Sequence, residues 1–233
     1  MARRVLLNQA IPAAAFVPAF VLTRCMMLRT ILVVTLIGGA SAQAAPVALV
    51  GSRLYAPCVV CHEPNAWGSA DGAIPNLAGQ QKGYLSAQLG LFASGARVDT
   101  AMQVVTAHPK SANQSDFAAL ASYLSALAWN PAPLNGSGEH LRVGQEIYTH
   151  ICAACHGPDG RGQASNSVPR IAGQHYPYMR RQVEEAARLH RDLAPPEMTS
   201  ALRGMRESEK DALADYISRL GNADALVDPE HRP

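Results

Sequence analysis

Two five-residue stretches constrain this chain more than any other feature. Cys-Val-Val-Cys-His occupies residues 58–62, and Cys-Ala-Ala-Cys-His occupies residues 152–156. In such a box, two thiols three positions apart on one helical turn can form thioethers with the two vinyl groups of one porphyrin. The histidine that follows can then supply an axial nitrogen to the iron. The boxes therefore predict two covalently attached haem c groups.

Each box also has a competing interpretation. A C-x-x-C pair can be half of a zinc site or a redox dithiol. Neither alternative requires a histidine at the next position, and here that histidine occurs twice. We therefore expect thioether bonds and axial histidines at six positions: Cys58, Cys61 and His62 in the first box, and Cys152, Cys155 and His156 in the second.

The boxes belong to two copies of one repeat. They lie 94 residues apart, and the same offset relates Pro-Asn-Leu-Ala-Gly-Gln at residues 75–80 to Pro-Arg-Ile-Ala-Gly-Gln at residues 169–174. Before the boxes, and again near the end of each copy, the correspondence slips by one residue. A long internal repeat of this kind indicates a duplicated domain. We expect the first domain over residues 45–130, a linker rich in Pro, Gly, Asn and Ser over 131–139, and the second domain over 140–233.

Helical periodicity dominates both copies. A middle helix is expected to begin near Tyr84 and Tyr178, and a closing helix carries apolar residues at i, i+3, i+4 and i+7 in each copy. An irregular segment is expected between the two helices, and Ser208 with Asp211 resembles a capping box for the second closing helix. Because no stretch alternates like a strand, the predicted fold is all-α with two domains.

Residues 1–44 resemble an export leader. A signal is expected to begin at Met26 or Met27, with Arg29 as its positive region, an apolar run over 31–37 and cleavage near 42–45. An N-terminal membrane anchor is the alternative. Without the four arginines of this leader, the chain carries 16 basic and 18 acidic residues, which does not suggest a nucleic-acid-binding protein. Because c-type haem is attached outside the bacterial inner membrane, we expect a periplasmic protein, soluble or peripherally attached to that membrane.

The second axial ligand of each iron decides its chemistry. Methionine or histidine fills the coordination shell for electron transfer, whereas an open position allows ligand binding or peroxide chemistry. Met102 and Met198 occupy similar late positions in the two copies, 40 and 42 residues after the box histidines. The other candidates, His108, His175 and His190, are not duplicated, and we expect them at the surface or in loops.

The repeat also indicates which residues surround the ligands. A ligating histidine usually donates its other ring N–H to a carbonyl or carboxylate oxygen. Pro75 and Pro169 offer such a carbonyl in the loop after each box. The duplicated polar side chains are candidates for hydrogen bonds to a haem propionate: Gln80, Gln174, Tyr84 and Tyr178.

Together, the two boxes, the Pro-x-Leu/Ile-Ala-Gly-Gln loops, the tyrosines and the late methionines resemble the di-haem cytochrome c4 family over residues 47–221. The resemblance implies two tandem cytochrome c domains related by a pseudo-twofold axis, each enclosing one haem. It also implies a periplasmic electron carrier, often membrane-associated, with axial pairs His62/Met102 and His156/Met198. The first copy departs from the family at Glu63, where Gly is more common, and after Met102, where the chain is longer.

Three functions compete at this point. The first is a carrier of single electrons between redox protein partners: a terminal oxidase, a quinol–cytochrome c reductase or a dehydrogenase. The second is a cytochrome subunit docked on a sulfide or alcohol dehydrogenase. The third is a di-haem enzyme such as a thiosulfate dehydrogenase, which would need one open, labile or cysteine-ligated iron. No cysteine outside the boxes remains once the leader is removed, so we expect an electron-transfer protein and not an enzyme.

Overall fold

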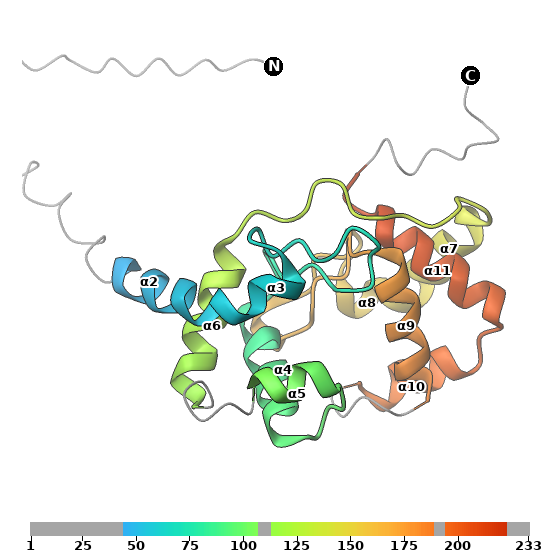
Figure 1. Ribbon diagram of the computed structural model, residues 1–233. Coiled ribbons are helices and arrows are strands. Elements are labelled where there is room, and N and C mark those ends of the chain that lie inside the picture. The colour runs from blue at the N-terminus through green and yellow to red at the C-terminus, as the bar shows by residue number, and fades with distance from the viewer. Residues whose placement is uncertain (1–43, 107–112, 189–193, 223–233) are drawn as a thin grey trace, which may run out of the picture. The chain divides into compact units, whose positions relative to one another are not determined.

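The computed structural model describes residues 44–106, 113–188 and 194–222, with the side chains of 44–47 omitted. Most of the expected leader, together with His108, His190 and His231, lies outside these residues. We call residues 44–130 half one and residues 140–222 half two. Figure 1 shows half one in blue to green and half two in yellow to red. The described residues of both halves belong to one compact unit.

The described residues are helical, apart from loops and one isolated bridge between Gln163 and Val168. Both halves follow the same order of elements. Half one contains α2 (Ala44–Tyr55), the 3₁₀ turn η1 (Ala56–Cys58), α3 (Val59–His62), α4 (Lys82–Ser94), α5 (Thr100–Thr106) and α6 (Gln114–Ala126). Half two contains α7 (Leu141–Ile147), the π-helical turn η2 (Tyr148–Cys152), α8 (Ala153–His156), the 3₁₀ turn η3 (Ala164–Asn166), α9 (Tyr176–Ala187), α10 (Pro196–Arg203) and α11 (Glu207–Arg219).

The first and last helices of each half cross at a glycine. A Cβ atom on Gly51 of α2 would lie 2.4 Å from the Cβ atom of Tyr123 on α6. A Cβ atom on Gly144 of α7 would lie 2.1 Å from the carbonyl oxygen of Ala212 on α11. Only glycine permits so close an approach of two helix backbones. These two glycines, which the repeat aligns with the one-residue slip, therefore set the crossing of the first and last helices in each half.

The one-residue slip before the boxes has a local explanation. Tyr55 and Tyr148 are equivalent, because each packs its ring on the tyrosine of the closing helix, with ring centroids 5.8 Å and 5.6 Å apart. In half one, Cys58 is the third residue after Tyr55, and a 3₁₀ turn joins them. In half two, Cys152 is the fourth residue after Tyr148, and a π turn joins them. Because a π turn holds more residues than a 3₁₀ turn, it accommodates the extra residue without displacing the box.

Each half encloses its own apolar core. In half one, Tyr55, Leu85, Leu120 and Leu124 are buried together, with Cys58 packed against them. In half two, Tyr148, Met179, Leu213 and Ile217 are buried together, with Cys152 packed against them. The box cysteines thus lie at the border of a core in both halves, where an apolar porphyrin can be placed.

Two expectations about helix boundaries are wrong. The segment between the middle and closing helices is not irregular throughout, because it contains α5 in half one and α10 in half two. The closing helix α11 begins at Glu207, and its N-terminal bond joins the Arg206 backbone N–H to the Glu209 carboxylate at 2.8 Å. The capping residue is therefore Arg206, two residues before Ser208, and Glu209 fills the role that was expected of Asp211. The expected capping box of Ser208 and Asp211 is not formed at the helix start.

Among the described helices, none is long and apolar enough to cross a membrane.

Candidate haem-binding sites

The two box histidines have the same hydrogen bond. The Nδ1 atom of His62 lies 3.1 Å from the carbonyl oxygen of Pro75, and the Nδ1 atom of His156 lies 3.0 Å from that of Pro169. In the tautomer that donates from Nδ1, the lone pair of Nε2 is left for a metal. The structure thus places each loop proline in the position proposed for it from the sequence.

Burial favours the neutral form of both imidazoles. It lowers the pKa of His62, against the smaller opposite effects of the Pro75 carbonyl and the Asp99 carboxylate. Burial also lowers the pKa of His156, with the Pro169 carbonyl acting in the opposite direction. Neutral imidazole is the form that ligates iron, so the local electrostatics suit this role.

Of the four box cysteines, Cys58 and Cys152 are partly buried and Cys61 and Cys155 are exposed. Burial, with a smaller contribution from the second thiol of each box, raises the pKa of both Cys58 and Cys152 to about 11. A C-x-x-C redox dithiol instead carries a thiol of low pKa. Within the described residues, no three His, Cys, Asp or Glu side chains gather as a metal-binding cluster. The donor set fits a covalently bound haem: two thiols for thioethers and one neutral imidazole in each half.

The late methionines lie on equivalent elements. Met102 is partly buried on α5, which packs against the middle helix α4. Met198 is partly buried on α10, which packs against the middle helix α9, and its side chain contacts the core of half two. Asp99, which caps the Met102 N–H at 3.1 Å, is close enough to His62 to affect its pKa. The start of α5 is therefore near the first box, and the ligand role of both methionines stays a prediction.

The chain leaves the two boxes through different residues in the same conformation. Glu63 has φ of 64° and ψ of 160°, and Gly157 has φ of 80° and ψ of 159°. The backbone oxygen of each accepts a hydrogen bond from the buried tyrosine of its half, Tyr55 in half one at 2.7 Å and Tyr148 in half two at 2.5 Å. This region of φ and ψ is nearly restricted to glycine. The first box therefore ends in a strained residue and the second does not.

The duplicated glutamines have contacts that the sequence did not predict. Gln80 and Gln174 are buried, and each uses its side-chain amide to bind the backbone of the opposite half. Gln80 pairs with Arg170, and Gln174 pairs with Asn76. A hydrogen bond to a propionate, the role proposed for them from the sequence, stays a prediction.

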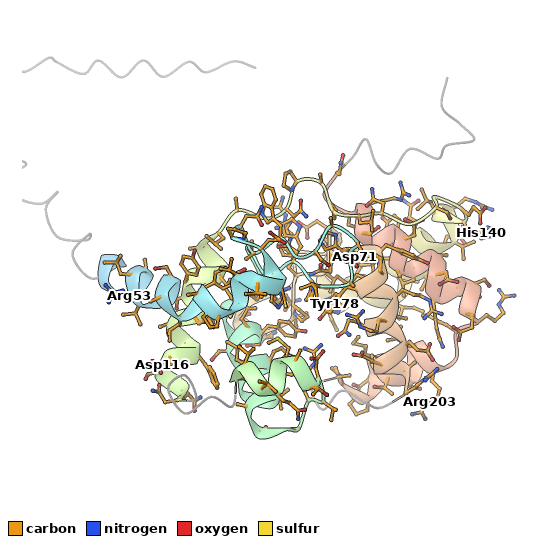
Figure 2. The ribbon with its side chains drawn as sticks, in the orientation of Figure 1. Arg53, Asp71, Asp116, His140, Tyr178 and Arg203 are labelled. Atoms are coloured by element: carbon orange, nitrogen blue, oxygen red, sulfur yellow. The ribbon has the colours of Figure 1, made fainter. Side chains whose placement is uncertain are left out.

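The proposed tyrosines occupy equivalent positions in the two halves. Both are partly buried at the start of the middle helices. The hydroxyl of Tyr178 accepts a hydrogen bond of 3.4 Å from Arg97, whose guanidinium also binds Gln88 and Gln182. Figure 2 labels Tyr178 near the centre of the ribbon in that view. The propionate role of Tyr84 and Tyr178 stays a prediction, while Arg97 is a link between the halves that the sequence analysis missed.

His175 lies in the loop directly before α9, as one branch of the expectation had it, but it is not at the surface. Its side chain is buried, its Nδ1 atom accepts the N–H of Leu134 at 2.9 Å, and its Nε2 atom lies 2.7 Å from the carbonyl oxygen of Trp67. The indole of Trp129 donates to the carbonyl oxygen of Gly173 at 3.1 Å. His175 and the two tryptophans thus form the junction of the halves. None of these three residues is duplicated in the repeat. That could have indicated a role between the copies, because a junction between two copies need not be symmetric.

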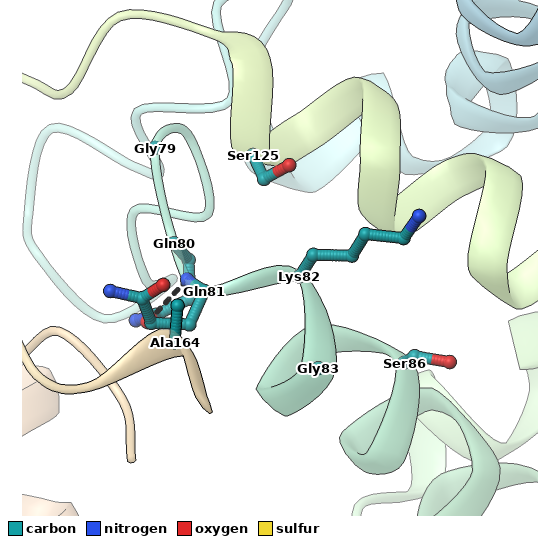
Figure 3. Close-up of a pocket in the computed structure, with 8 residues that line it drawn as sticks. All are labelled: Gly79, Gln80, Gln81, Lys82, Gly83, Ser86, Ser125 and Ala164. Atoms are coloured by element: carbon teal, nitrogen blue, oxygen red, sulfur yellow. Dashed lines mark hydrogen bonds between the residues drawn. The ribbon is translucent and has the colours of Figure 1, made fainter. Parts of the chain in front are cut away.

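A polar pocket lies beside this junction. It is lined by Lys82, Ser86 and Ser125 of half one and by Ala164 of half two, as Figure 3 shows. It contains neither box, so it adds nothing to the candidate haem sites.

The fold and the paired boxes define a protein of two tandem cytochrome c domains, and comparison with known proteins agrees. The cytochrome c family matches residues 48–128 and 142–221. A thiosulfate dehydrogenase electron acceptor of Stutzerimonas stutzeri (strain A1501) is 32% identical over 70% of this chain and 79% of its own length. Cytochrome c4 of Azotobacter vinelandii is 29% identical over 77% of this chain and 91% of its own length.

Solved structures give the same result at the level of the fold. The crystal structure of reduced cytochrome c4 from Pseudomonas stutzeri aligns with a TM-score of 0.65 and 23% identity, covering 74% of this chain and 98% of that one. The chain belongs to the di-haem cytochrome c4 family of tandem cytochrome c proteins. It binds two covalent haem c groups and is a di-haem electron carrier.

Proposed function

We propose that this protein is a periplasmic carrier that accepts single electrons from a dehydrogenase and passes them toward a terminal oxidase. Each haem supplies one iron that takes up and releases one electron. The observation that carries the proposal is the duplication of the whole ligand arrangement. Both halves contain a box histidine bonded to a loop carbonyl, buried in half one and partly buried in half two, and a methionine on a short helix against the middle helix.

In this proposal, His62 and Met102 are the axial ligands in half one, and His156 and Met198 are those in half two. Two protein ligands on each iron leave no open position for a substrate, so the chain acts as a carrier and not as an enzyme. The likeness to a thiosulfate dehydrogenase electron acceptor supports a dehydrogenase as the electron donor. A donor that removes two electrons from its substrate could reduce both haem irons of one carrier molecule.

The ligand assignment is tested by near-infrared absorption of the purified ferric holoprotein. We expect the methionine-to-iron charge-transfer band from both haems. Met102→Ala and Met198→Ala should each remove about half of its intensity and leave the other half. Met205→Ala, which removes a partly buried methionine packed against the same core, is the matched control and should leave the band intact. A high-spin or bis-histidine haem in the unaltered protein would disprove the assignment for that half.

The carrier role is tested with thiosulfate as the electron source. The ferric protein mixed with thiosulfate alone should stay oxidised, and addition of a catalytic amount of a thiosulfate dehydrogenase should reduce both haems. Rapid repeated turnover of thiosulfate by the protein alone would show an enzyme instead. Isolation of the native protein in a stable complex with a sulfide or alcohol dehydrogenase would show a subunit and not a mobile carrier.

A further inference from the structure

The junction of the halves contains a pair of equivalent clamps. In half two, the Gln174 side chain accepts the Asn76 N–H at 2.9 Å and donates to the Asn76 carbonyl oxygen at 2.8 Å. In half one, the Gln80 side chain accepts the Arg170 N–H at 2.8 Å and donates to the Arg170 carbonyl oxygen at 2.8 Å. Each amide thus holds both backbone polar groups of one residue in the opposite half.

The two glutamines are themselves held in place. The Oε1 atom of Gln80 also accepts the Gln81 N–H at 2.9 Å, and the Oε1 atom of Gln174 accepts the His175 N–H at 3.0 Å. Both side chains are buried, with 6% and 4% of their surface exposed. Water therefore does not compete for these bonds, and a buried amide with both ends paired has a single orientation.

The clamped residues lie directly beside the partners of the box histidines. Asn76 follows Pro75, whose carbonyl oxygen is 3.1 Å from Nδ1 of His62. Arg170 follows Pro169, whose carbonyl oxygen is 3.0 Å from Nδ1 of His156. Because that carbonyl group and the next N–H belong to one planar peptide unit, fixing the N–H also fixes the direction of the carbonyl.

We propose that Gln174 and Gln80 are positioning residues that act across the junction: each orients the carbonyl that binds the box histidine of the opposite half, and so tunes the reduction potential of the opposite haem. The inference rests on the proposed function in one respect, which is that His62 and His156 are axial ligands. A firm hydrogen bond from Nδ1 makes the imidazole a stronger electron donor to iron and favours the ferric state. Loosening a clamp therefore raises the potential of the haem on the other side.

The test uses Gln174→Leu and Gln80→Leu in the full-length holoprotein. Each haem is followed separately in a redox titration through the NMR signals of its own axial histidine. Gln174→Leu should shift the oxidised-to-reduced ratio of the haem ligated by His62 two- to tenfold toward reduced, up to about 59 mV for one electron. The haem ligated by His156 should change little, and Gln80→Leu should give the reverse pattern.

Gln81→Leu is the matched control. Gln81 also bonds across the junction, from its Nε2 atom to the carbonyl oxygen of Arg161 at 2.9 Å. The peptide unit that it holds donates, through the Gly162 N–H, to the backbone oxygen of His156 and not to the imidazole ring. Figure 3 shows Gln80 and Gln81 next to each other beside the loop of half two. Loss of Gln81 should leave both potentials unchanged. If Gln174→Leu lowers haem incorporation, Gln174→Asn keeps the amide and shortens its reach by one methylene, and the same crosswise shift is expected.

A second readout separates positioning from general damage. Hydrogen exchange of the His62 Nδ1 proton in the reduced protein should become faster in Gln174→Leu, while that of His156 stays slow. Equal shifts in both haems, a shift only in the haem of the altered half, or no shift would each overturn the proposal. Any of these three outcomes would refute only the positioning role, provided that the unaltered protein shows His/Met ligation. If the unaltered protein lacks His/Met ligation, the proposed carrier function itself is refuted.

Discussion

At the level of single residues, the two box exits show how equal motifs acquire unequal surroundings. Glu63 and Gly157 have nearly the same backbone angles, and each follows the histidine of its box. A side chain in this conformation costs on the order of 1–3 kcal/mol, because Cβ is crowded by the backbone. The hydrogen bond from Tyr55 to the Glu63 carbonyl holds the strained conformation in place. The strain is thus confined to the first haem site.

Replacement of Glu63 by glycine should stabilise half one. We expect a gain of about 1 kcal/mol, since relief of the strain exceeds the extra entropy of glycine in the unfolded chain. Guanidinium unfolding of the holoprotein, followed by circular dichroism, measures it. Glu63→Ala retains the Cβ atom and should give no gain, whereas Gly157→Glu should destabilise half two. A gain from alanine as large as that from glycine would show that the carboxylate, and not the backbone, is responsible.

At the level of elements, the sequence predicted the box-bearing, middle and closing helices of each copy. It did not predict the short helix between the last two or the start of the second closing helix. The repeat is visible because the boxes, the loop and the crossing glycines recur at almost constant offset. The helices α5 and α10 were missed, because each is at most eight residues long, which is too short for apolar periodicity to identify a helix. Their helical form depends on packing against α4 and α9, which local sequence does not specify.

The helix crossings give a sharp test of this architecture. Gly51→Ala and Gly144→Ala should each destabilise the holoprotein by about 2–3 kcal/mol, because the new methyl group meets backbone atoms of the closing helix that cannot move aside. Gly90→Ala on α4 is the matched control, since a Cβ atom there meets nothing within 4 Å. It should stabilise the protein slightly, as alanine is the better helix former. Thermal unfolding of the three variants measures both effects, and similar losses in all three would contradict the crossing.

At the level of the whole molecule, the halves share a fold but differ in electrostatics. The ion pairs found within the described residues lie in half two, and several join α9 to α11 through Lys210, Arg180 and Glu184. Lys210 is almost buried and binds both Glu184 and Glu207. Its hydrogen bonds are the largest cause that lowers the pKa of each of these carboxyl groups. A lowered carboxyl pKa links the stability of half two to pH.

The sign of that dependence follows from proton binding. Glu184 and Glu207 bind protons less tightly in the folded state than at their ordinary pKa of 4.5, so the stability they contribute is present above that value and is lost as the pH falls further. We expect acid to destabilise half two, and Lys210→Met to make that loss shallower. Lys82→Met in half one should leave the slope unchanged. The free energy of unfolding is measured with denaturant at several pH values from 6 downward. If it depends on pH equally in Lys210→Met and Lys82→Met, this expectation is wrong.

The junction shows why the relation between the copies exceeded what sequence could predict. A repeat identifies Gln80 with Gln174 but does not reveal that each side chain faces the other copy. Asp215 illustrates the same point for the expected linker, because its buried carboxylate accepts the N–H groups of Gly136 and Gly138 at 2.9 and 2.7 Å. Such contacts join residues far apart in the sequence and depend on how the two folded halves pack against each other. They can be recognised only from the three-dimensional structure.

His175 gives the last prediction, which concerns the cooperativity of the whole molecule. Its ring joins the linker N–H of Leu134 to the Trp67 carbonyl of half one, so both halves and their connection meet in one buried side chain. We expect the unaltered holoprotein to unfold in one calorimetric transition. His175→Ala removes the partner of two partly buried backbone groups and should weaken the coupling by about 1–3 kcal/mol, which splits the transition in two. His150→Ala removes an exposed histidine that bonds only within its own half, to the Glu146 carbonyl, and should leave the single transition intact. A single transition in His175→Ala would mean that the other bonds across the junction, the glutamine clamps and Arg97 among them, are enough to couple the halves.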